Sequence, residues 1–190
     1  MSIVEKDICD YLAIAKVLAN QLADQADRIA RERRIPPSVA TAMADAGLFR
    51  LLVPHSLGGA ELDFLEYLKV VEIFAKADGS SAWCVNQNNV FATNSVRIPE
   101  ATAQQVWSDP RTVITNGPPT PGSVAVPVEG GFILSGRWEF SSGIRHANWV
   151  AALAPIGQSD KNHPVMSDPT SGVVLIIPKE EVEVLDVWQV

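Results

Sequence analysis

The sequence GFILSGRWEFSSGIRHANWV, residues 131–150, decides how the rest of the chain is interpreted. Even-numbered positions from 132 to 140 carry Phe, Leu, Gly, Trp and Phe, while positions 135, 137 and 139 carry Ser, Arg and Glu. This alternation predicts a strand over 132–140 with one buried face. The pattern stops at Ser141, Ser142 and Gly143, which we call the corner, and a second strand is predicted over 147–155.

The corner allows two interpretations. Small residues let the backbone approach a flat partner closely, and hydroxyl and N–H groups beside aromatic side chains can bind an aromatic ring system. Gly and Ser are also ordinary turn residues, so the corner can equally be a bend in a β-barrel. The local sequence leaves both interpretations open.

Upstream of this stretch the apolar residues have helical spacing. Residues 3–34 predict one long amphipathic helix that ends at Pro36 and Pro37, and further helices are predicted over 39–46, 64–77, 82–95 and 99–107. Asp63 is the candidate N-cap of helix 64–77, and Ser80 or Ser81 is the candidate for the helix that follows.

Beyond residue 110, Pro, Gly and β-branched runs replace the helical spacing. Strands are predicted over 112–115, 123–128, 132–140, 147–155, 173–178 and 182–184, with a polar loop over 160–171. We therefore expect an α+β chain. An all-α helical domain, residues 1–110, would be followed by an antiparallel β-barrel or sandwich domain, residues 111–190.

The helix predicted over 82–95 is unusually rich in amides, because it carries Asn or Gln at positions 86–89 and again at 94. Such side chains compete with the helical backbone and need partners. They can be exposed or hold loops in place, or one or two of them can line a polar spot in an apolar pocket. Trp83, Asn86 and Val90 share one face of this helix and are the candidates for the second interpretation.

Composition excludes several classes of partner. The chain has 190 residues and a formal net charge of −7, which argues against nucleic acid or an anionic membrane as a partner, since both attract basic surfaces. Cys9 and Cys84 are expected to be reduced thiols, and the isolated His55, His146 and His163 predict no metal site. No apolar run reaches about 18 residues and no signal-peptide pattern is present, so a cytoplasmic location is expected.

The last residues, VLDVWQV at 184–190, are largely apolar. A β-domain that stops on such a segment would leave an open strand edge. We therefore expect either that the chain is cut here or that a partner completes the sheet.

Three segments together resemble the acyl-CoA dehydrogenase superfamily: LFRLLVPHSLGG (48–59), EYLKVVEIFAKADGSSAWC (66–84) and the stretch from Gly130 to Val150. The Trp-x-Phe-Ser-Ser-Gly sequence and the His-Ala-Asn-Trp that follows are more similar to its two-component, flavin-dependent monooxygenases than to true dehydrogenases. The resemblance runs from about Leu12 to Val190. It implies the helical N-terminal domain and the β-structured middle domain of that superfamily.

The activity that the resemblance implies is hydroxylation of an aromatic or polycyclic small molecule through a flavin C4a-hydroperoxide. The enzyme would use dioxygen and reduced FMN or FAD, receive the flavin from a separate reductase, and form a homotetramer at full length. An acyl-CoA dehydrogenase or oxidase with bound FAD, and a non-catalytic remnant of the same fold, are the alternatives.

The resemblance also assigns residues. Ser141 and Ser142 would face the flavin N5 and O4 region, with Ser142 as the catalytic hydrogen-bond donor. Asn116 and Gly117 would contact the pyrimidine edge, and Phe140 would lie beside the ring. Trp83, Asn86 and Val90 would face the substrate.

One part of the family pattern is absent. The family's C-terminal helical domain, which carries the histidine expected to act as catalytic base, does not occur in this sequence. His146, a few residues after the corner, is interpreted as structural.

Overall fold

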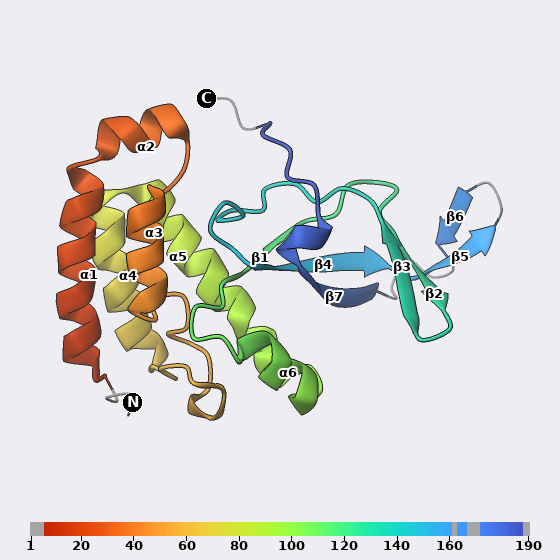
Figure 1. Ribbon diagram of the computed structural model, residues 1–190, viewed down its shortest axis with the longest axis horizontal. Helices are drawn as coiled ribbons and strands as arrows, with labels where there is room; N and C mark the ends of the chain where they lie inside the picture. The colour runs from red at the N-terminus through yellow and green to blue at the C-terminus, as the bar shows by residue number, and fades with distance from the viewer. Residues whose placement is uncertain (1–5, 161–162, 167–171, 188–190) are drawn as a thin grey trace.

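The computed structural model describes residues 6–160, 163–166 and 172–187. The helices are α1 (Ile8–Ala23), α2 (Ala26–Glu32), α3 (Pro37–Asp45), α4 (Phe64–Ala77), α5 (Gly79–Ala92) and α6 (Glu100–Trp107), with short 3-10 turns η1 (His55–Leu57), η2 (Thr93–Val96) and η3 (Lys179–Glu181). The strands are β1 (Ile114–Gly117), β2 (Val124–Val128), β3 (Gly131–Ser135), β4 (Trp149–Pro155), β5 (Gly157–Asp160), β6 (His163–Met166) and β7 (Gly172–Pro178). Helices occupy one side of the molecule and strands the other, with α5 at the boundary (Figure 1).

The helical part forms as the apolar spacing predicts, with one difference. Helix α4 has the predicted bounds, and the Asp63 side chain caps it by accepting a hydrogen bond from the Leu65 N–H. The single helix predicted over 3–34 is wrong, because Gln25 leaves helical geometry and separates α1 from α2. The apolar spacing continues across this break, so the pattern alone could not reveal it.

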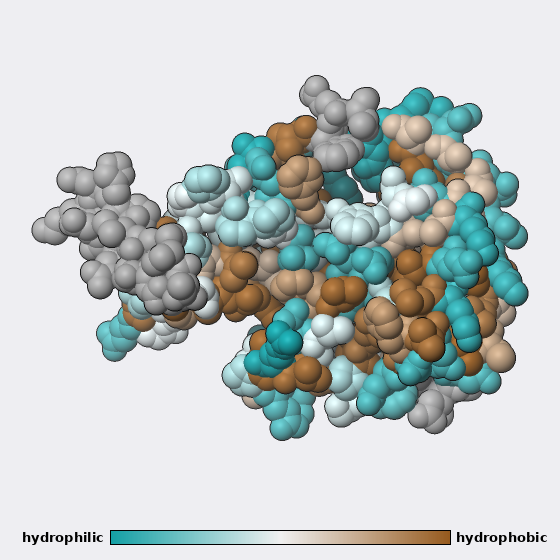
Figure 2. All heavy atoms as spheres, turned by 180° about the vertical axis from the view of Figure 1, so that it is seen from behind, coloured by the Kyte–Doolittle hydropathy of each residue, from teal (hydrophilic) through white to brown (hydrophobic). Residues whose placement is uncertain are grey.

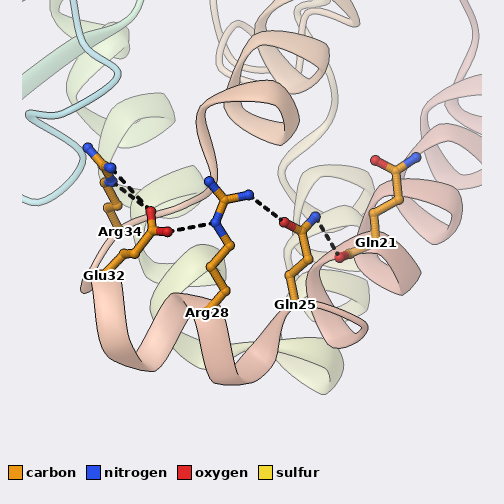
Figure 3. Close-up of polar contacts among 5 residues, drawn as sticks. All are labelled: Gln21, Gln25, Arg28, Glu32 and Arg34. Atoms are coloured by element: carbon orange, nitrogen blue, oxygen red, sulfur yellow. Dashed lines mark hydrogen bonds and ion pairs between the residues drawn. The ribbon is translucent and has the colours of Figure 1, made fainter.

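The break between α1 and α2 is bridged by polar side chains (Figure 3). Gln25 donates to the Gln21 carbonyl at 3.4 Å and accepts from Arg28 at 3.2 Å. Glu32 then pairs with Arg28 at 2.7 Å, and its other oxygen pairs with Arg34. Glu32 therefore holds both arginines, and this position of Arg34 matters below.

Within the described residues the strands form three small sheets. The largest has the order β1-β4-β7, in which β1 and β4 are parallel and β4 and β7 antiparallel. Hairpins β2-β3 and β5-β6 complete the set. The expected fold class, a helical part followed by small sheets, is confirmed, although the β1-β4 pairing is parallel where antiparallel pairing was expected.

Three strand predictions need correction within the described residues. Strand β3 ends at Ser135 instead of residue 140, because Gly136 turns at φ 146° against Ser123. Strands β5 and β6 occupy part of the segment predicted as a polar loop. The segment 182–184 is irregular, because η3 turns the chain away after β7.

The core crosses the expected domain boundary. One buried cluster joins α1, α3, α4 and α5 with Val113 and Ala147, and a second joins α6 with Ile114 and Ala151. The division into domains 1–110 and 111–190 therefore stays a prediction. None of the described helices has the length and apolar character needed to cross a bilayer.

Large apolar side chains remain exposed on the helices. Seen from behind, hydrophobic residues gather over the middle of the molecule between the helical part and the strands (Figure 2). Phe64, Leu65 and Leu68 on α4, and Trp83 and Val90 on α5, are exposed. Surface of this kind commonly marks an interaction or ligand site.

The cap of α5 gives a first prediction. Asp78 caps this helix by accepting from the Ser81 N–H at 2.6 Å, so the predicted Ser80 or Ser81 cap is wrong. We expect Asp78→Ala to lower the free energy of unfolding by about 1 kcal/mol, because it leaves a helix N–H unpaired. Urea denaturation measures the loss. Glu129→Ala, in the exposed β2-β3 turn, is the control, and equal unfolding curves for the two variants would contradict the capping role.

Candidate functional site

The corner is held against the end of β1. A Cβ atom placed on Gly117 would lie 2.0 Å from the Glu139 carbonyl oxygen and 2.5 Å from Ser141 Oγ. The buried Thr115 hydroxyl donates to the Ser142 carbonyl at 2.6 Å. The first strand and the corner, which are far apart in sequence, therefore form one unit, and Gly117 is needed at their contact.

The backbone at the corner turns the Phe140 ring outward. Phe140 has φ 51° and is 65% exposed, and its carbonyl accepts from the Ser142 N–H at 2.7 Å. Trp138 instead lies against the sheet, where its indole N–H donates to the Leu153 carbonyl at 2.8 Å. An exposed aromatic ring therefore lies beside the corner.

Helix α5 contacts the corner through Trp83, and Asn88 Oδ1 lies against Gly143. The Trp83 indole N–H donates to Ser142 Oγ at 3.0 Å, and Trp83 is 53% exposed. The Ser142 hydroxyl itself donates to the Phe140 carbonyl at 3.4 Å, which is long for an O–H···O bond. A hydroxyl has one proton and two lone pairs, so the indole fixes Ser142 Oγ as an acceptor, and the proton is held only by this long bond, which a ligand acceptor would replace.

Three of the α5 amides have hydrogen-bond partners in other segments of the described chain. Asn89 is buried and bonds the Leu51 N–H and the Leu48 carbonyl, while Asn88 donates to the Ile114 carbonyl at 2.8 Å. Asn86 accepts from the Tyr67 hydroxyl at 2.9 Å. Asn88 and Asn89 therefore have structural roles, as one of the two interpretations of the amide-rich helix predicts. Asn86, a candidate for the other interpretation, also has a protein partner.

The residues assigned to the site differ in whether their side chains already make hydrogen bonds. Asn116 and Ser141 are half-buried, and no side-chain hydrogen bond engages either of them within residues 6–160, 163–166 and 172–187. Asn116 directly precedes Gly117, and Ser141, which directly follows the exposed Phe140, has its Oγ against Gly117. Val90 is exposed on α5, one helical turn beyond Asn86. Available donors and acceptors beside an exposed aromatic ring can bind the edge of a flat heteroaromatic ring.

His146, which the sequence analysis interprets as structural, packs against other parts of the protein. Its ring stacks on Phe49 at 4.9 Å, and its Nε2 lies 3.1 Å from Asn88 Oδ1. Because Asn88 donates its own N–H to Ile114, its oxygen must accept, so His146 carries its proton on Nε2. Burial, with a smaller contribution from the Lys179 charge, lowers the pKa of His146 to about 4.

This pKa predicts how stability depends on pH. The unfolded chain takes up a proton on His146 near its ordinary pKa of 6.5, whereas the folded protein does so only near 4, so acid favours unfolding between these values. We expect the urea midpoint to fall across this range by more in the wild type than in His146→Gln, which keeps an N–H donor. Carboxylates titrate in both proteins, so only the difference reports on His146. Parallel curves would contradict the buried neutral histidine.

Comparison with known proteins gives one family match. Residues 12–107 match the family described as acyl-CoA dehydrogenase, N-terminal domain. The oxygenase subunit HsaA of a flavin-dependent monooxygenase from Mycobacterium tuberculosis is 29% identical over 190 residues, which is 100% of this chain and 46% of that protein. A pigment production hydroxylase from Rhodococcus erythropolis is 32% identical over 177 residues, 90% of this chain and 44% of that protein.

Solved structures give the same picture. The crystal structure of M. tuberculosis HsaA matches with a TM-score of 0.83 and 29% identity. The match covers 97% of this chain and 47% of the HsaA chain. XiaF from Streptomyces sp., in complex with FADH2 and glycerol, matches with a TM-score of 0.86 and 25% identity. The match covers 96% of this chain and 45% of the XiaF chain. The chain thus spans about half the length of the relatives it matches.

Proposed function

This chain belongs to the family of acyl-CoA dehydrogenase N-terminal domains, and on that basis we propose that it forms the flavin-facing part of a monooxygenase. The reaction would be hydroxylation of an aromatic or polycyclic small molecule. The observation that carries the proposal is the Trp83–Ser142 hydrogen bond beside the open corner. The flavin-dependent monooxygenases among the similar proteins favour this activity over that of an acyl-CoA dehydrogenase or oxidase.

The residues at the corner fit a flavin. Gly117 lacks a side chain where a Cβ atom would meet Glu139 and Ser141, and the Ser141 hydroxyl and the Asn116 amide retain hydrogen-bonding capacity among the described residues. Asn116, Gly117, Phe140, Ser141 and Ser142 would hold the isoalloxazine edge. Reduced FMN or FAD, when bound, would supply the activation of dioxygen.

Ser142 is the residue that we propose as catalytic. Trp83 directs a lone pair of Ser142 Oγ toward the indole, and Thr115 holds the Ser142 carbonyl, so the hydroxyl proton has a defined direction. A fixed donor beside an atom that gains negative charge lowers the barrier, because it does not have to reorient during the reaction. Ser142 would donate in this way, and Trp83 and Thr115 would position it.

The substrate would lie on the α5 side of the corner. Trp83 and Val90 present exposed apolar surface there, and Asn86 is the nearby polar group. An aromatic substrate fits an apolar surface with one polar anchor. The Asn86 oxygen is occupied by Tyr67, so the Asn86 amide N–H group would be the anchor.

The remaining parts of the proposal concern partners. The name of HsaA, an oxygenase subunit, favours a separate flavin reductase as the source of reduced flavin. We also propose dioxygen as co-substrate, a homotetramer at full length, a cytoplasmic location, and no nucleic-acid or membrane partner. Sedimentation of the intact protein tests the tetramer, and a monomer would contradict it.

Incubation of the intact protein with reduced FMN or FAD, dioxygen and a panel of phenols and polycyclic aromatics tests the activity. Hydroxylated product is expected, and flavin fluorescence measures binding separately. Flavin binding without product would point to the dehydrogenase or oxidase, which an acyl-CoA would reveal by reducing bound FAD. A stable protein that binds no flavin would be the non-catalytic remnant.

Trp83→Phe isolates the positioning hydrogen bond. The phenyl ring keeps most of the apolar surface but removes the N–H that reaches Ser142 Oγ. A neutral hydrogen bond contributes about 1 kcal/mol, so product yield should fall roughly fivefold. Product and hydrogen peroxide are quantified in the same reaction, and the affinity for flavin is expected to be unchanged. Trp138→Phe, which removes the indole N–H bonded to Leu153 on the sheet, is the matched control, and equal effects would contradict the role of Trp83.

A further inference from the structure

A cavity separate from the corner lies between α3 and the segments before β4 and after β7. Its volume is about 450 Å³, and small and apolar residues of α3 form one wall. Four cationic side chains line it, Arg34, Arg111, Arg145 and Lys179, together with His146. In Figure 1, the loop before β4 lies at the side of the sheet that faces the helices.

Carboxylates outside the cavity lining hold three of these cations. The ion pairs are Arg34 with Glu32 at 3.1 Å (Figure 3), Arg145 with Asp186 at 3.1 Å, and Arg111 with Asp45. Asp186 is shared with Arg33. The described side chains that line the cavity include no carboxylate.

Lys179 has a different environment. Its Nζ donates to the Arg145 carbonyl at 3.3 Å, and no carboxylate lies within ion-pair distance of it among the described residues. Burial, together with the nearby Arg145 charge, lowers the pKa of Lys179. Glu180 and Glu181 on the same turn are exposed and do not line the cavity. Within the part of the chain that the structure describes, a half-buried ammonium without a counter-charge is thus placed at the edge of a positively charged cavity.

We propose that this cavity binds a small oxyanion that carries at least two negative charges, a phosphate or a short dicarboxylate. Lys179 would supply the unpaired ammonium and Arg145 a guanidinium, which binds planar oxyanions with two parallel hydrogen bonds. The formal charge of the chain is −7, so the local surplus of cations is opposite in sign to the molecule as a whole. Attraction is stronger here than on open surface, because the cavity walls exclude part of the water.

The site is distinct from the proposed flavin site. None of Asn116, Gly117, Phe140, Ser141 and Ser142 lines the cavity. His146 lies between the two, since it lines the cavity while its Nε2 contacts Asn88 beside Gly143. Burial and, to a smaller extent, the Lys179 charge lower the pKa of His146, so an anion beside Lys179 should raise that pKa and make the histidine a reporter of binding.

Titration of the intact, flavin-free protein with inorganic phosphate, at constant ionic strength, tests the proposal by calorimetry and by the NMR signal of His146. A second titration uses malonate, and chloride is the monovalent control. Saturable binding of phosphate or malonate with a raised His146 pKa is expected, and the stronger of the two identifies the class of ligand. Absence of saturation with both, or equal binding of chloride, would overturn the proposal.

Variants locate the site. Lys179→Met and Arg145→Met should each weaken binding roughly tenfold, because each removes a charged hydrogen-bond donor. Lys69→Met, an exposed lysine on α4, is the matched control and should bind as the wild type does. Circular dichroism verifies that each variant folds. Unchanged affinity in both cavity variants would overturn the proposal.

Discussion

Ser142→Ala should lower the yield of hydroxylated product by roughly 100-fold, which corresponds to about 2.7 kcal/mol of lost stabilisation. The variant removes the hydroxyl whose oxygen is fixed by Trp83 at 3.0 Å and whose proton makes only a long bond, 3.4 Å, to the Phe140 carbonyl. Reduced flavin should still react with dioxygen, so hydrogen peroxide should be released in place of product. Product by chromatography and peroxide by a coupled assay give the ratio directly.

Two further variants make this result specific. Ser142→Thr keeps the hydroxyl and should recover much of the yield. Ser135→Ala, on the exposed end of β3, should leave the yield unchanged. A Ser142→Ala protein that binds flavin and hydroxylates at the wild-type yield would contradict the catalytic role of Ser142.

Gly117→Ala should damage both flavin affinity and stability. The added Cβ atom would lie 2.0 Å from the Glu139 carbonyl oxygen, so β1 and the corner would have to separate. Overpacking of this kind costs about 1–3 kcal/mol, and a corner moved from Thr115 and Trp83 should bind flavin at least roughly tenfold more weakly. Urea denaturation and flavin fluorescence measure the two losses.

Gly131→Ala is the matched control for this prediction. Gly131→Ala adds the same methyl group on β3, but a Cβ atom there would meet nothing within 4 Å. It should therefore unfold and bind flavin as the wild type does. Wild-type flavin affinity in Gly117→Ala would show that the contact between β1 and the corner does not form the binding surface.

The sequence predicted the helices well where local signals were complete. Helix α4 has both a regular apolar face and an Asp63 cap, and its bounds are those predicted. The break at Gln25 leaves the apolar spacing intact, and the end of β3 at Gly136 depends on a contact with Ser123, so periodicity extended both elements too far. The parallel pairing of β1 with β4 also depends on residues distant in sequence.

The residue types of the candidate site could be read from the sequence, but the contacts among them could not. The small residues of the corner indicated a place for a flat ligand, and the structure brings Trp83, Thr115 and Gly117 to it. The partners of the α5 amides come from α4, from the segment after α3 and from β1, which no local pattern connects to them. The cationic cavity was missed, because its arginines and Lys179 lie on four separate segments of the chain.

A crystal structure of the intact protein with bound flavin tests the central claim most directly. We predict that the isoalloxazine edge lies in hydrogen-bond contact with Ser142 Oγ, against Gly117 and the face of Phe140. A ring bound elsewhere, with protein side chains filling the space in front of Ser142, would contradict it.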